Sequence, residues 1–245
     1  MAEAPDWEAP ERPRPPGPDE VHVWRLHLDA APLVGAPWEA VVSDDERRRA
    51  AQLRLEPHRR RFLRARAALR AILGSCLDLP PQDLRFEYAE HGKPHLPPSL
   101  AGNLTFNVSH SGQVAVVALA RGREVGVDVE QTGREVAWEQ VARRFFAPSE
   151  WEALEALPEA RRRDGFFACW TRKEAYLKAR GRGLSVGLST FAVSLGPADG
   201  GLTWSAGDPL ASEWWLVGLE PGEGYAGAVC ARGAGWRLRC RQWRC

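Results

Sequence analysis

The chain has 245 residues, of which 44% are hydrophobic and 27% charged, and its formal net charge at pH 7 is +1. This length permits one large domain or two small ones, and the composition is ordinary for a globular protein. The near-zero net charge gives no global field that favours a nucleic acid or a membrane surface, so we expect neither as a partner.

No stretch approaches the roughly 18 consecutive apolar residues that a membrane span requires. The N-terminal region also lacks the apolar segment of a secretory signal. The five cysteines show no metal-ligand spacing, and free thiols in a reducing compartment are their simplest explanation. We therefore expect a cytoplasmic protein.

The first elements follow from composition and periodicity. Residues 1–20 carry six prolines among charged residues, a composition that predicts a disordered lead-in. Residues 21–29 alternate apolar and polar side chains and predict a strand. Ser43 and Glu46 have the spacing of a capping box, so we expect a helix to begin there and to be interrupted at Pro57.

A second helix is predicted over residues 59–77. Its apolar side chains recur at the spacing of one helix face, and they are Leu69, Ile72, Leu73, Cys76 and Leu77. Six arginines lie mostly on the remaining surface, namely Arg59, Arg60, Arg61, Arg64, Arg66 and Arg70. Such a run is equally consistent with a solvated helix face and with a functional surface.

The segment at residues 125–130, VGVDVE, predicts the most informative strand. Strand side chains alternate between two faces, so one face carries only the valines Val125, Val127 and Val129. The opposite face carries Asp128 and Glu130 beside Gly126. The valine face can pack on a core, whereas the other face holds two adjacent carboxylates. Two further strands are expected at 104–108 and 114–120, around a loop at 109–112.

The rest of the chain alternates helices and strands. We expect a helix near residues 134–146, closed by Pro148, and a second capping box at Ser149 and Glu152. A long helix should cover residues 164–179 and stop at Gly181 and Gly183. Strands should follow at 191–195, 202–205, 214–220, 225–231 and 236–241. The similar strand ends LARG (119–122) and CARG (230–233) suggest two α+β halves with a site between them.

Two pairs of residues have the types and spacing needed for metal and phosphate chemistry. The carboxylates of Asp128 and Glu130 suit magnesium, which takes one or two protein carboxylates and completes its shell with water and phosphate. The alternative is an exposed polar strand face. Glu174 and Lys178 stand at i and i+4 on one helix face, where the alternative is a surface ion pair. Neither pair is decisive alone.

Two polar turns are also candidates. Lys93 lies in the tight turn Gly92-Lys93-Pro94, and His110 follows Ser109 in the segment NVSHS. Each is either a solvated loop side chain or a contact for a phosphate group. The chain contains no Walker P-loop, no dinucleotide-binding glycine motif and no nucleophile elbow.

Read in order, the motifs are GKPHL (92–96), FNVSHS (106–111), GVDVE (126–130), RRFF (143–146) and WTRKEAYLKARGRGLS (170–185). This series resembles the 4′-phosphopantetheinyl transferases, in particular the long single-chain type that activates peptide and polyketide synthases. The resemblance covers roughly residues 21–231. It implies an α+β fold in which two similar halves, 21–122 and 123–245, form a pseudo-twofold pseudo-dimer with the active site in the cleft.

The resemblance also implies site residues. Asp128, Glu130 and Glu174 match the family's metal ligands, and Glu174 is metal ligand, general base or both. Lys178 matches a lysine that contacts the pyrophosphate of coenzyme A, and with Glu174 it is the expected catalytic pair. The other expected coenzyme A contacts are Arg49, Arg61, Lys93, Pro94, Ser109 and His110, of which His110 and Arg61 would reach the 3′-phosphate.

The implied activity is that of a holo-[acyl-carrier-protein] synthase. With Mg²⁺, it moves 4′-phosphopantetheine from coenzyme A to a serine of an acyl or peptidyl carrier protein and releases 3′,5′-ADP. The aromatic segment around Phe145, Phe146 and Trp151 lies where the family contacts its carriers, although core packing is the favoured interpretation for Phe145. We expect a monomer. The alternatives are a non-catalytic coenzyme A-binding regulatory module and a metal-dependent phosphohydrolase, and the natural carrier stays open.

Overall fold

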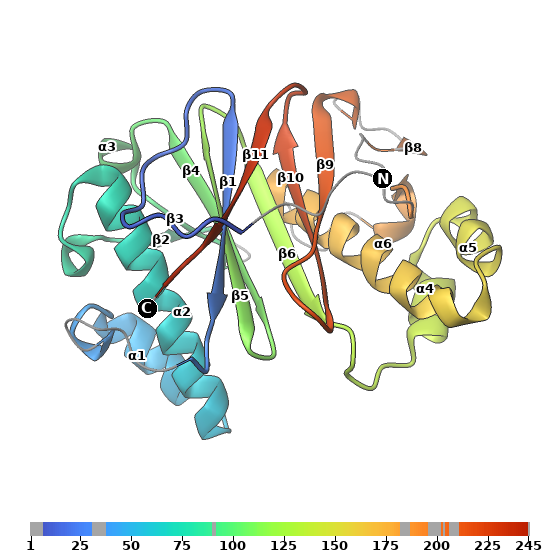
Figure 1. Ribbon diagram of the computed structural model, residues 1–245, viewed down its shortest axis with the longest axis horizontal. Helices are drawn as coiled ribbons and strands as arrows, with labels where there is room; N and C mark the ends of the chain where they lie inside the picture. Colours follow the sequence, from blue (N-terminus) through green and yellow to red (C-terminus); the bar gives the residue numbers. More distant parts are fainter. Residues whose placement is uncertain are drawn as a thin grey trace.

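The computed structural model describes residues 7–30, 38–89, 92–181, 187–195, 202, 204–205 and 211–244. Two β-sheets stand side by side in the middle of the molecule, with one group of helices at each flank (Figure 1). The architecture is α+β, as predicted. Among the described residues, no helix combines the length and the apolar character needed to cross a membrane.

The first sheet has the strand order β11-β1-β5-β4. Its strands are β1 (Glu20–His27), β4 (Leu104–Ser111), β5 (Val114–Arg121) and β11 (Arg237–Gln242). All neighbours are antiparallel except β1 and β11, which run parallel. The long helix α2 (Glu56–Leu77) covers one face, and the core between them includes Trp24, Leu69, Ile72, Leu73 and Leu119.

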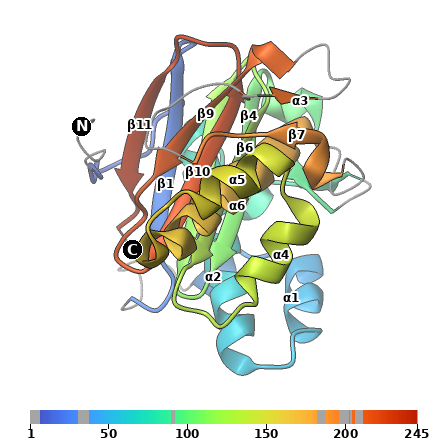
Figure 2. The same cartoon turned by 90° about the vertical axis from the view of Figure 1, so that its right-hand side faces the viewer.

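The second sheet has the order β6-β10-β9 and is antiparallel. It consists of β6 (Val125–Gln131), β9 (Trp214–Leu219) and β10 (Tyr225–Arg232). Helix α6 (Glu159–Arg180) lies across it, as the side view shows (Figure 2). The core on this side is aromatic, with Phe166, Phe167 and Tyr176 buried against Ala228 and Cys230.

A third core joins the two sheets. It combines Val21, Val23 and Val116 of the first sheet with the valine face of β6, which is Val125, Val127 and Val129. The prediction that these valines pack on a core is therefore confirmed. Because the valine face is held between the sheets, the opposite face of β6 is turned toward α6, and Gly126 lies directly under that helix.

The remaining elements are short and lie around this frame. Three helices flank the sheets: α1 (Asp44–Ala51), α4 (Trp138–Phe145) and α5 (Pro148–Glu155). Smaller pieces are α3 (Pro98–Ala101), β2 (Glu87–Tyr88), β3 (Pro94–His95), β7 (Phe191–Ala192) and β8 (Trp204–Ser205), with 3₁₀ turns at Trp38–Ala40, Pro81–Asp83, Leu188–Thr190 and Ala211–Glu213.

Helix ends follow the cap rules in some places and not in others. The capping box of α1 is present, since the backbone N–H of Ser43 donates to Glu46 Oε2 at 2.9 Å. Gly181 closes α6 in the left-handed region with φ 66°, as predicted, while Gly183 lies outside the described residues. The predicted box at Ser149 is wrong. Helix α5 begins at Pro148, and Glu150 accepts from Ala147 N at 2.7 Å.

Two other boundaries differ from prediction. Helix α1 ends at Ala51, and Pro57 lies in the first turn of α2 rather than interrupting a helix, because a first-turn residue needs no intrahelical N–H partner. Strand β4 continues to Ser111, so the loop expected at 109–112 is mostly strand. Because residues 109–111 are polar, the hydrophobic pattern did not predict that the strand extends through them.

Residues 7–20 are not the disordered lead-in that composition predicts, and residues 1–6 lie outside the described part. Trp7 Nε1 donates to Glu220 O at 2.9 Å, and Glu8 N donates to Cys240 O at 3.2 Å. Pro13 is buried, and its carbonyl accepts from Ser75 Oγ at 2.8 Å. This segment has no regular structure of its own but binds along both sheets.

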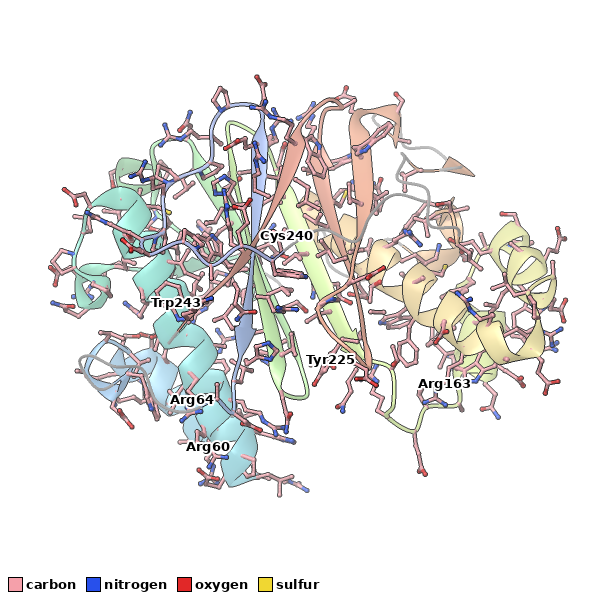
Figure 3. All side chains as sticks on the ribbon, viewed as in Figure 1. Arg60, Arg64, Arg163, Tyr225, Cys240 and Trp243 are labelled. Atoms are coloured by element: carbon pink, nitrogen blue, oxygen red, sulfur yellow. The ribbon has the colours of Figure 1, made fainter. Side chains whose placement is uncertain are left out.

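The C-terminal tail also has a structural place. Strand β11 forms the edge of the first sheet, and Trp243 beyond it packs edge-on against Trp24 with ring centroids 6.1 Å apart (Figure 3). The first sheet thus contains strands from both ends of the chain. The division into halves at residues 122 and 123 stays a prediction.

Glu20 ties β1 to β11, and this contact predicts a pH dependence of stability. Hydrogen bonds from His22 and from the Gly17 backbone lower the pKa of Glu20 to about 2, and Arg239 Nε lies 3.4 Å from its Oε1. In the unfolded chain Glu20 takes up a proton near the ordinary glutamate pKa of 4.5, so its contribution is complete above that pH and is lost as pH falls toward 2.

We therefore expect Glu20→Gln to lower the free energy of unfolding at pH 7. The difference from wild type should shrink between about pH 4.5 and pH 2. Urea unfolding across this range measures it. A difference that stays constant with pH would contradict the assigned contact.

Candidate active site

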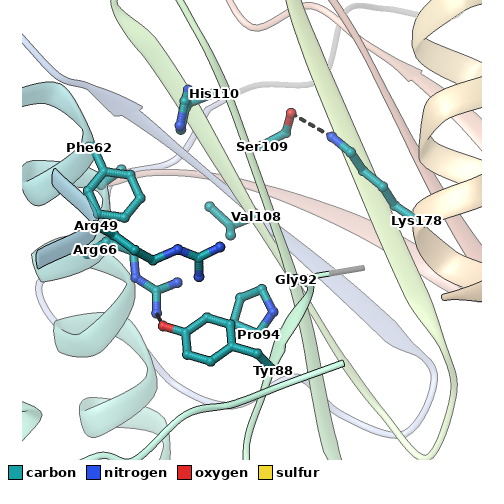
Figure 4. A pocket seen from close by; sticks show the side chains of 11 residues that line it. Arg49, Phe62, Arg66, Tyr88, Gly92, Pro94, Val108, Ser109, His110 and Lys178 are labelled. Atoms are coloured by element: carbon teal, nitrogen blue, oxygen red, sulfur yellow. Dashed lines mark hydrogen bonds between the residues drawn. The ribbon is translucent and has the colours of Figure 1, made fainter. Parts of the chain in front are cut away.

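A pocket opens beside the edge of the first sheet, and α6 closes one side of it (Figure 4). It takes residues from five parts of the chain. The lining comprises Arg49, Phe62, Ala65, Arg66, Tyr88, Gly92, Pro94, Val108, Ser109, His110 and Lys178. Four of the expected coenzyme A contacts, Arg49, Pro94, Ser109 and His110, are thus brought together with Lys178.

Buried ion pairs hold the arginine wall of this pocket. Glu46, which is fully buried, accepts from Arg66 Nε at 2.6 Å and from Arg70 Nε at 2.7 Å. Burial by itself raises the pKa of Glu46, but the positive charges of Arg66 and Arg70 outweigh it and the net pKa is lowered. Part of the arginine run is therefore interior structure, and a solvated helix face does not describe it.

Tyr88 connects this buried cluster to the pocket. Its hydroxyl accepts from Arg66 at 3.0 Å, and the Arg49 guanidinium lies 4.7 Å from the centre of its ring. Arg49 therefore faces the pocket across an aromatic surface, a favourable arrangement for a partly desolvated cation. Nothing in the sequence signalled Tyr88 or Phe62 as lining residues.

Arg61 is placed differently from expectation. It is not among the residues that line the pocket. Its guanidinium binds Asp29 in a bidentate pair, with Nε 3.0 Å from Oδ1 and a terminal nitrogen 2.5 Å from Oδ2. This hydrogen bond lowers the pKa of Asp29. Contact between Arg61 and a ligand would require that pair to open.

Lys93 is also not among the residues that line the pocket, although its neighbours Gly92 and Pro94 are. Its Nζ donates to the carbonyl oxygen of Lys178 at 2.5 Å. Carbonyl groups at the end of a helix attract cations, and Lys93 thereby ties the GKP turn to the end of α6. Desolvation, together with the nearby charge of Lys178, lowers its pKa to about 8.

Asp128 is the centre of the acidic face of β6. Its Oδ1 accepts from Lys178 Nζ at 2.6 Å and from Ser109 Oγ at 2.8 Å. Lys178 Nζ is also 2.9 Å from Ser109 Oγ (Figure 4). Among the residues that the structure describes, its Oδ2 is buried without a protein partner. One carboxylate oxygen is thus occupied, and the other is buried and available to a cation.

Glu130 and Glu174 share the electrostatic field of Asp128. Burial, and then the charge of Asp128, raises the pKa of each. Glu130 accepts from Ser111 Oγ at 2.8 Å and from Arg134 at 3.1 Å. Within the described ranges, however, no three His, Cys, Asp or Glu side chains are gathered closely enough to hold a metal ion. The expected ligands interact electrostatically but do not enclose a common point.

Gly126 is what allows α6 to approach this face. A Cβ atom at Gly126 would lie 2.2 Å from Ala175 O and 2.3 Å from Ala179 N. Because Gly126 has no side chain, the backbone of α6 at Ala175 and Ala179 rests directly on the strand. This contact places Glu174 and Lys178 beside Asp128. A glycine within a strand pattern signals such close approach.

A second buried ion pair fixes α6 from the other side. Lys173 Nζ is 2.7 Å from Glu150 Oε1 and donates to Phe191 O at 2.6 Å, and both charged side chains are almost fully buried. Sequence reasoning missed this pair, because a lysine beside Glu174 looks like another surface charge. The pair joins α5 and β7 to the turn of α6 that carries Glu174.

The RRFF segment divides between core and surface. Phe146 is buried and stacks on Phe166 with centroids 5.4 Å apart, whereas Phe145 is 38% exposed beside Arg144. The core interpretation favoured for Phe145 is therefore wrong. Phe145 is the last residue of α4, whereas Phe146 follows the helix with extended backbone, so the two side chains take different directions.

The fold and the pocket define an α+β protein with a cationic pocket next to the buried carboxylate of Asp128. Comparisons with known proteins identify its family. Residues 37–121 match the family model described as 4′-phosphopantetheinyl transferase, N-terminal, and residues 124–230 match that of the 4′-phosphopantetheinyl transferase superfamily.

Individual relatives extend this match over most of the chain. The chain is 38% identical over 230 residues to the 4′-phosphopantetheinyl transferase HetI of Nostoc sp., and the aligned region covers 92% of this chain and 94% of HetI. It is 34% identical over 181 residues to the 4′-phosphopantetheinyl transferase Sfp of Bacillus subtilis, covering 70% and 78%. The chain belongs to the 4′-phosphopantetheinyl transferase superfamily, and the alternative of a non-catalytic regulatory module has no support.

Gly126→Ala tests the close packing of α6 on β6. The added methyl group would overlap helix backbone that cannot move alone, so we expect the free energy of unfolding to fall by about 1–3 kcal/mol or more. Urea unfolding measures this loss. Gly133→Ala is the control, because its Cβ would meet nothing within 4 Å. Equal stability of the two variants would contradict the packing argument.

Proposed function

We propose that the pocket binds coenzyme A and that the protein transfers its 4′-phosphopantetheine group to a serine of an acyl or peptidyl carrier protein. The observation that carries this proposal is the contact between Lys178 and Asp128 at 2.6 Å. It lies where the cationic pocket meets the acidic face of β6. A diphosphate bound there would have a fixed cation on one side and carboxylates on the other.

The chain's cations are arranged to receive an anionic ligand. Arg49, His110 and Lys178 line one pocket, and we propose that Arg49 and His110 contact the 3′-phosphate. Desolvation lowers the pKa of His110, and the charge of Lys178 lowers it further, so a bound phosphate would favour its charged form. Pro94 and Ser109 form part of the wall, and Lys93 supports it from behind through Lys178 O.

We propose that Asp128, Glu130 and Glu174 hold a magnesium ion, directly or through water molecules, since the described residues form no three-ligand cluster by themselves. The buried Oδ2 of Asp128 has no partner within the described part of the chain, and carboxylate oxygens are the ligands that magnesium prefers. The pKa values of Glu130 and Glu174 are raised in part by Asp128, as expected for like charges that a cation would neutralise. When bound, the ion would reduce the repulsion between the incoming oxygen and the phosphate.

The transfer itself forms a bond from the serine oxygen to phosphorus and breaks the bond from phosphorus to the leaving 3′,5′-ADP. The serine proton must be accepted, and Glu174 is the candidate acceptor, because its raised pKa makes it a stronger base than an exposed carboxylate. Lys178 supplies fixed positive charge in a partly desolvated position. Glu174 serves as metal ligand, as base or as both.

We further propose that the carrier docks near Phe145, which is exposed on α4, and Trp151, which lies under Arg143 with 4.3 Å between guanidinium and ring. This surface carries arginines, which suit an acidic partner. The protein would act as a monomer in the cytoplasm, where coenzyme A and carrier proteins meet.

A transfer assay tests the function. Purified protein is incubated with coenzyme A, Mg²⁺ and a panel of peptidyl, polyketide and fatty-acid carrier domains, and intact mass is recorded. We expect one phosphopantetheine on the carrier serine and loss of transfer on chelation of Mg²⁺. Release of 3′,5′-ADP without carrier would instead indicate a phosphohydrolase, and no mass gain on any carrier would refute the proposal.

Lys178→Ala tests the role of the pocket cation. Removing one preorganised charge-stabilising donor costs on the order of 10²–10³ in rate, so we expect a loss of that size in the carrier assay. Arg161→Ala is the matched control, since it removes an exposed cation from the same helix. A Lys178→Ala enzyme as active as this control would remove Lys178 from the mechanism.

A further inference from the structure

Two sheet edges face one another at the site without pairing as strands. Strand β4 is an edge of the first sheet and β6 is an edge of the second. Their backbones are not joined in a ladder, since β4 pairs with β5 and β6 pairs with β10, yet the two strands are in contact. Edge strands leave backbone N–H groups that need partners.

Asn107 and Ser111 of β4 supply such partners for β6, and Ser109 between them contacts a carboxylate of the same strand. Asn107 Oδ1 accepts from Val127 N at 2.8 Å. Ser109 Oγ donates to Asp128 Oδ1 at 2.8 Å. Ser111 Oγ accepts from Gln131 N at 3.1 Å. We call Asn107, Ser109 and Ser111 the polar comb, since their period of two directs all three side chains toward β6.

The alternate residues of β4 face the other way. Val108 and His110 line the pocket, and Phe106 is buried in the core beneath α2. The same strand therefore presents Val108 and His110 to the pocket and the polar comb to β6, with Ser109 in contact with both the pocket and β6. His110 lies between Ser109 and Ser111 in the strand. A ligand that binds His110 therefore contacts β4 next to the two serines that touch the carboxylates.

Each serine of the polar comb accepts one hydrogen bond and donates its own hydroxyl proton to a carboxylate of β6. Lys178 Nζ donates to Ser109 Oγ at 2.9 Å, which leaves the Ser109 proton for Asp128. In the same way, Gln131 N donates to Ser111 Oγ, which donates to Glu130 Oε2 at 2.8 Å. A hydroxyl that accepts one hydrogen bond and donates one to a carboxylate holds that carboxylate in one orientation.

We propose that Ser109 and Ser111 are positioning residues that orient the carboxylates of Asp128 and Glu130 from the opposite sheet, so that the acidic face of β6 is aligned with the pocket of β4. This inference rests on the proposed function, because it concerns the carboxylates expected to bind Mg²⁺. It gives Ser109, which also lines the pocket, a second role, and it adds Ser111, which acts through Glu130 and need not touch the metal or the substrate.

Ser111 is the better of the two to test, because Ser109 also lines the pocket. The variants are Ser111→Ala, which removes the hydroxyl, and Ser111→Thr, which keeps it. The matched control is Thr105→Val on the same face of β4. Thr105 Oγ1 donates to the carbonyl oxygens of Arg123 and Ala120, so this control also removes one hydroxyl from the strand but leaves the carboxylates untouched.

Four quantities are measured for each variant: the Mg²⁺ concentration for half-maximal transfer, the KM for coenzyme A, Mn²⁺ binding by calorimetry without a carrier present, and the urea unfolding midpoint. For Ser111→Ala we expect both metal constants, the half-maximal Mg²⁺ concentration and the Mn²⁺ dissociation constant, to rise by about 10-fold. This is the lower end of the loss seen when a group that supports a metal ligand is removed. The KM for coenzyme A should change by less than roughly 2-fold, by the same reasoning. Ser111→Thr should restore wild-type values.

Thr105→Val should shift the urea unfolding midpoint as much as Ser111→Ala while leaving both metal constants unchanged. If Ser111→Ala and Thr105→Val give the same metal constants, the positioning role is refuted and the comb is only structural. If the wild-type protein itself shows no transfer to any carrier, the proposed function fails, and the Mn²⁺ titration still decides whether Ser111 affects metal binding.

Discussion

The contact between α6 and the acidic face of β6 determines the rest of the site. Lys178 reaches Asp128 at 2.6 Å because the helix backbone rests on Gly126. Asp128 is only 4% exposed, and a carboxylate so buried is stable as an anion only with a partner. Lys178 satisfies one of its oxygens. The same arrangement leaves the second carboxylate oxygen of Asp128 for a cation. It also brings the charge of Asp128 close enough to raise the pKa values of Glu130 and Glu174, and it places the pocket beside these carboxylates.

Ion pairs on both sides keep this contact rigid. The Glu46 cluster fixes the arginine wall of the pocket, and the Glu150–Lys173 pair fixes α6 from behind. Removing one partner of such a pair leaves an uncompensated charge in the interior, which typically costs about 3–5 kcal/mol. These pairs therefore hold the pocket wall, which includes Arg66, and the turn of α6 that carries Glu174 in place. In the polar comb of β4, the uncharged hydroxyl groups of Ser109 and Ser111 hold the carboxylates of Asp128 and Glu130 in a similar way.

The sequence predicted what depends on local pattern. Alternation in VGVDVE placed the valines in a core and the carboxylates opposite, and the Ser43–Glu46 spacing marked the start of α1. It did not predict partners that are distant along the chain. Arg66 and Arg70 are paired in the interior with Glu46 of another helix. Residues 7–20 are held by distant groups, which include the backbone of β11, Glu220 and Ser75. Arg61 and Lys93 likewise find distant protein partners, which no motif reveals.

The central claim is that coenzyme A lies with its pyrophosphate at the carboxylates of β6. Phosphorus NMR of coenzyme A in the presence of protein and Mn²⁺ tests it directly, because a paramagnetic ion broadens the signals of phosphorus atoms close to it. The comparison is between wild type and Asp128→Asn, with coenzyme A binding of each verified by calorimetry. The account predicts strong, protein-dependent broadening of the pyrophosphate signals in wild type and its loss in Asp128→Asn. An Asp128→Asn protein that binds coenzyme A and broadens these signals as strongly as wild type would contradict it.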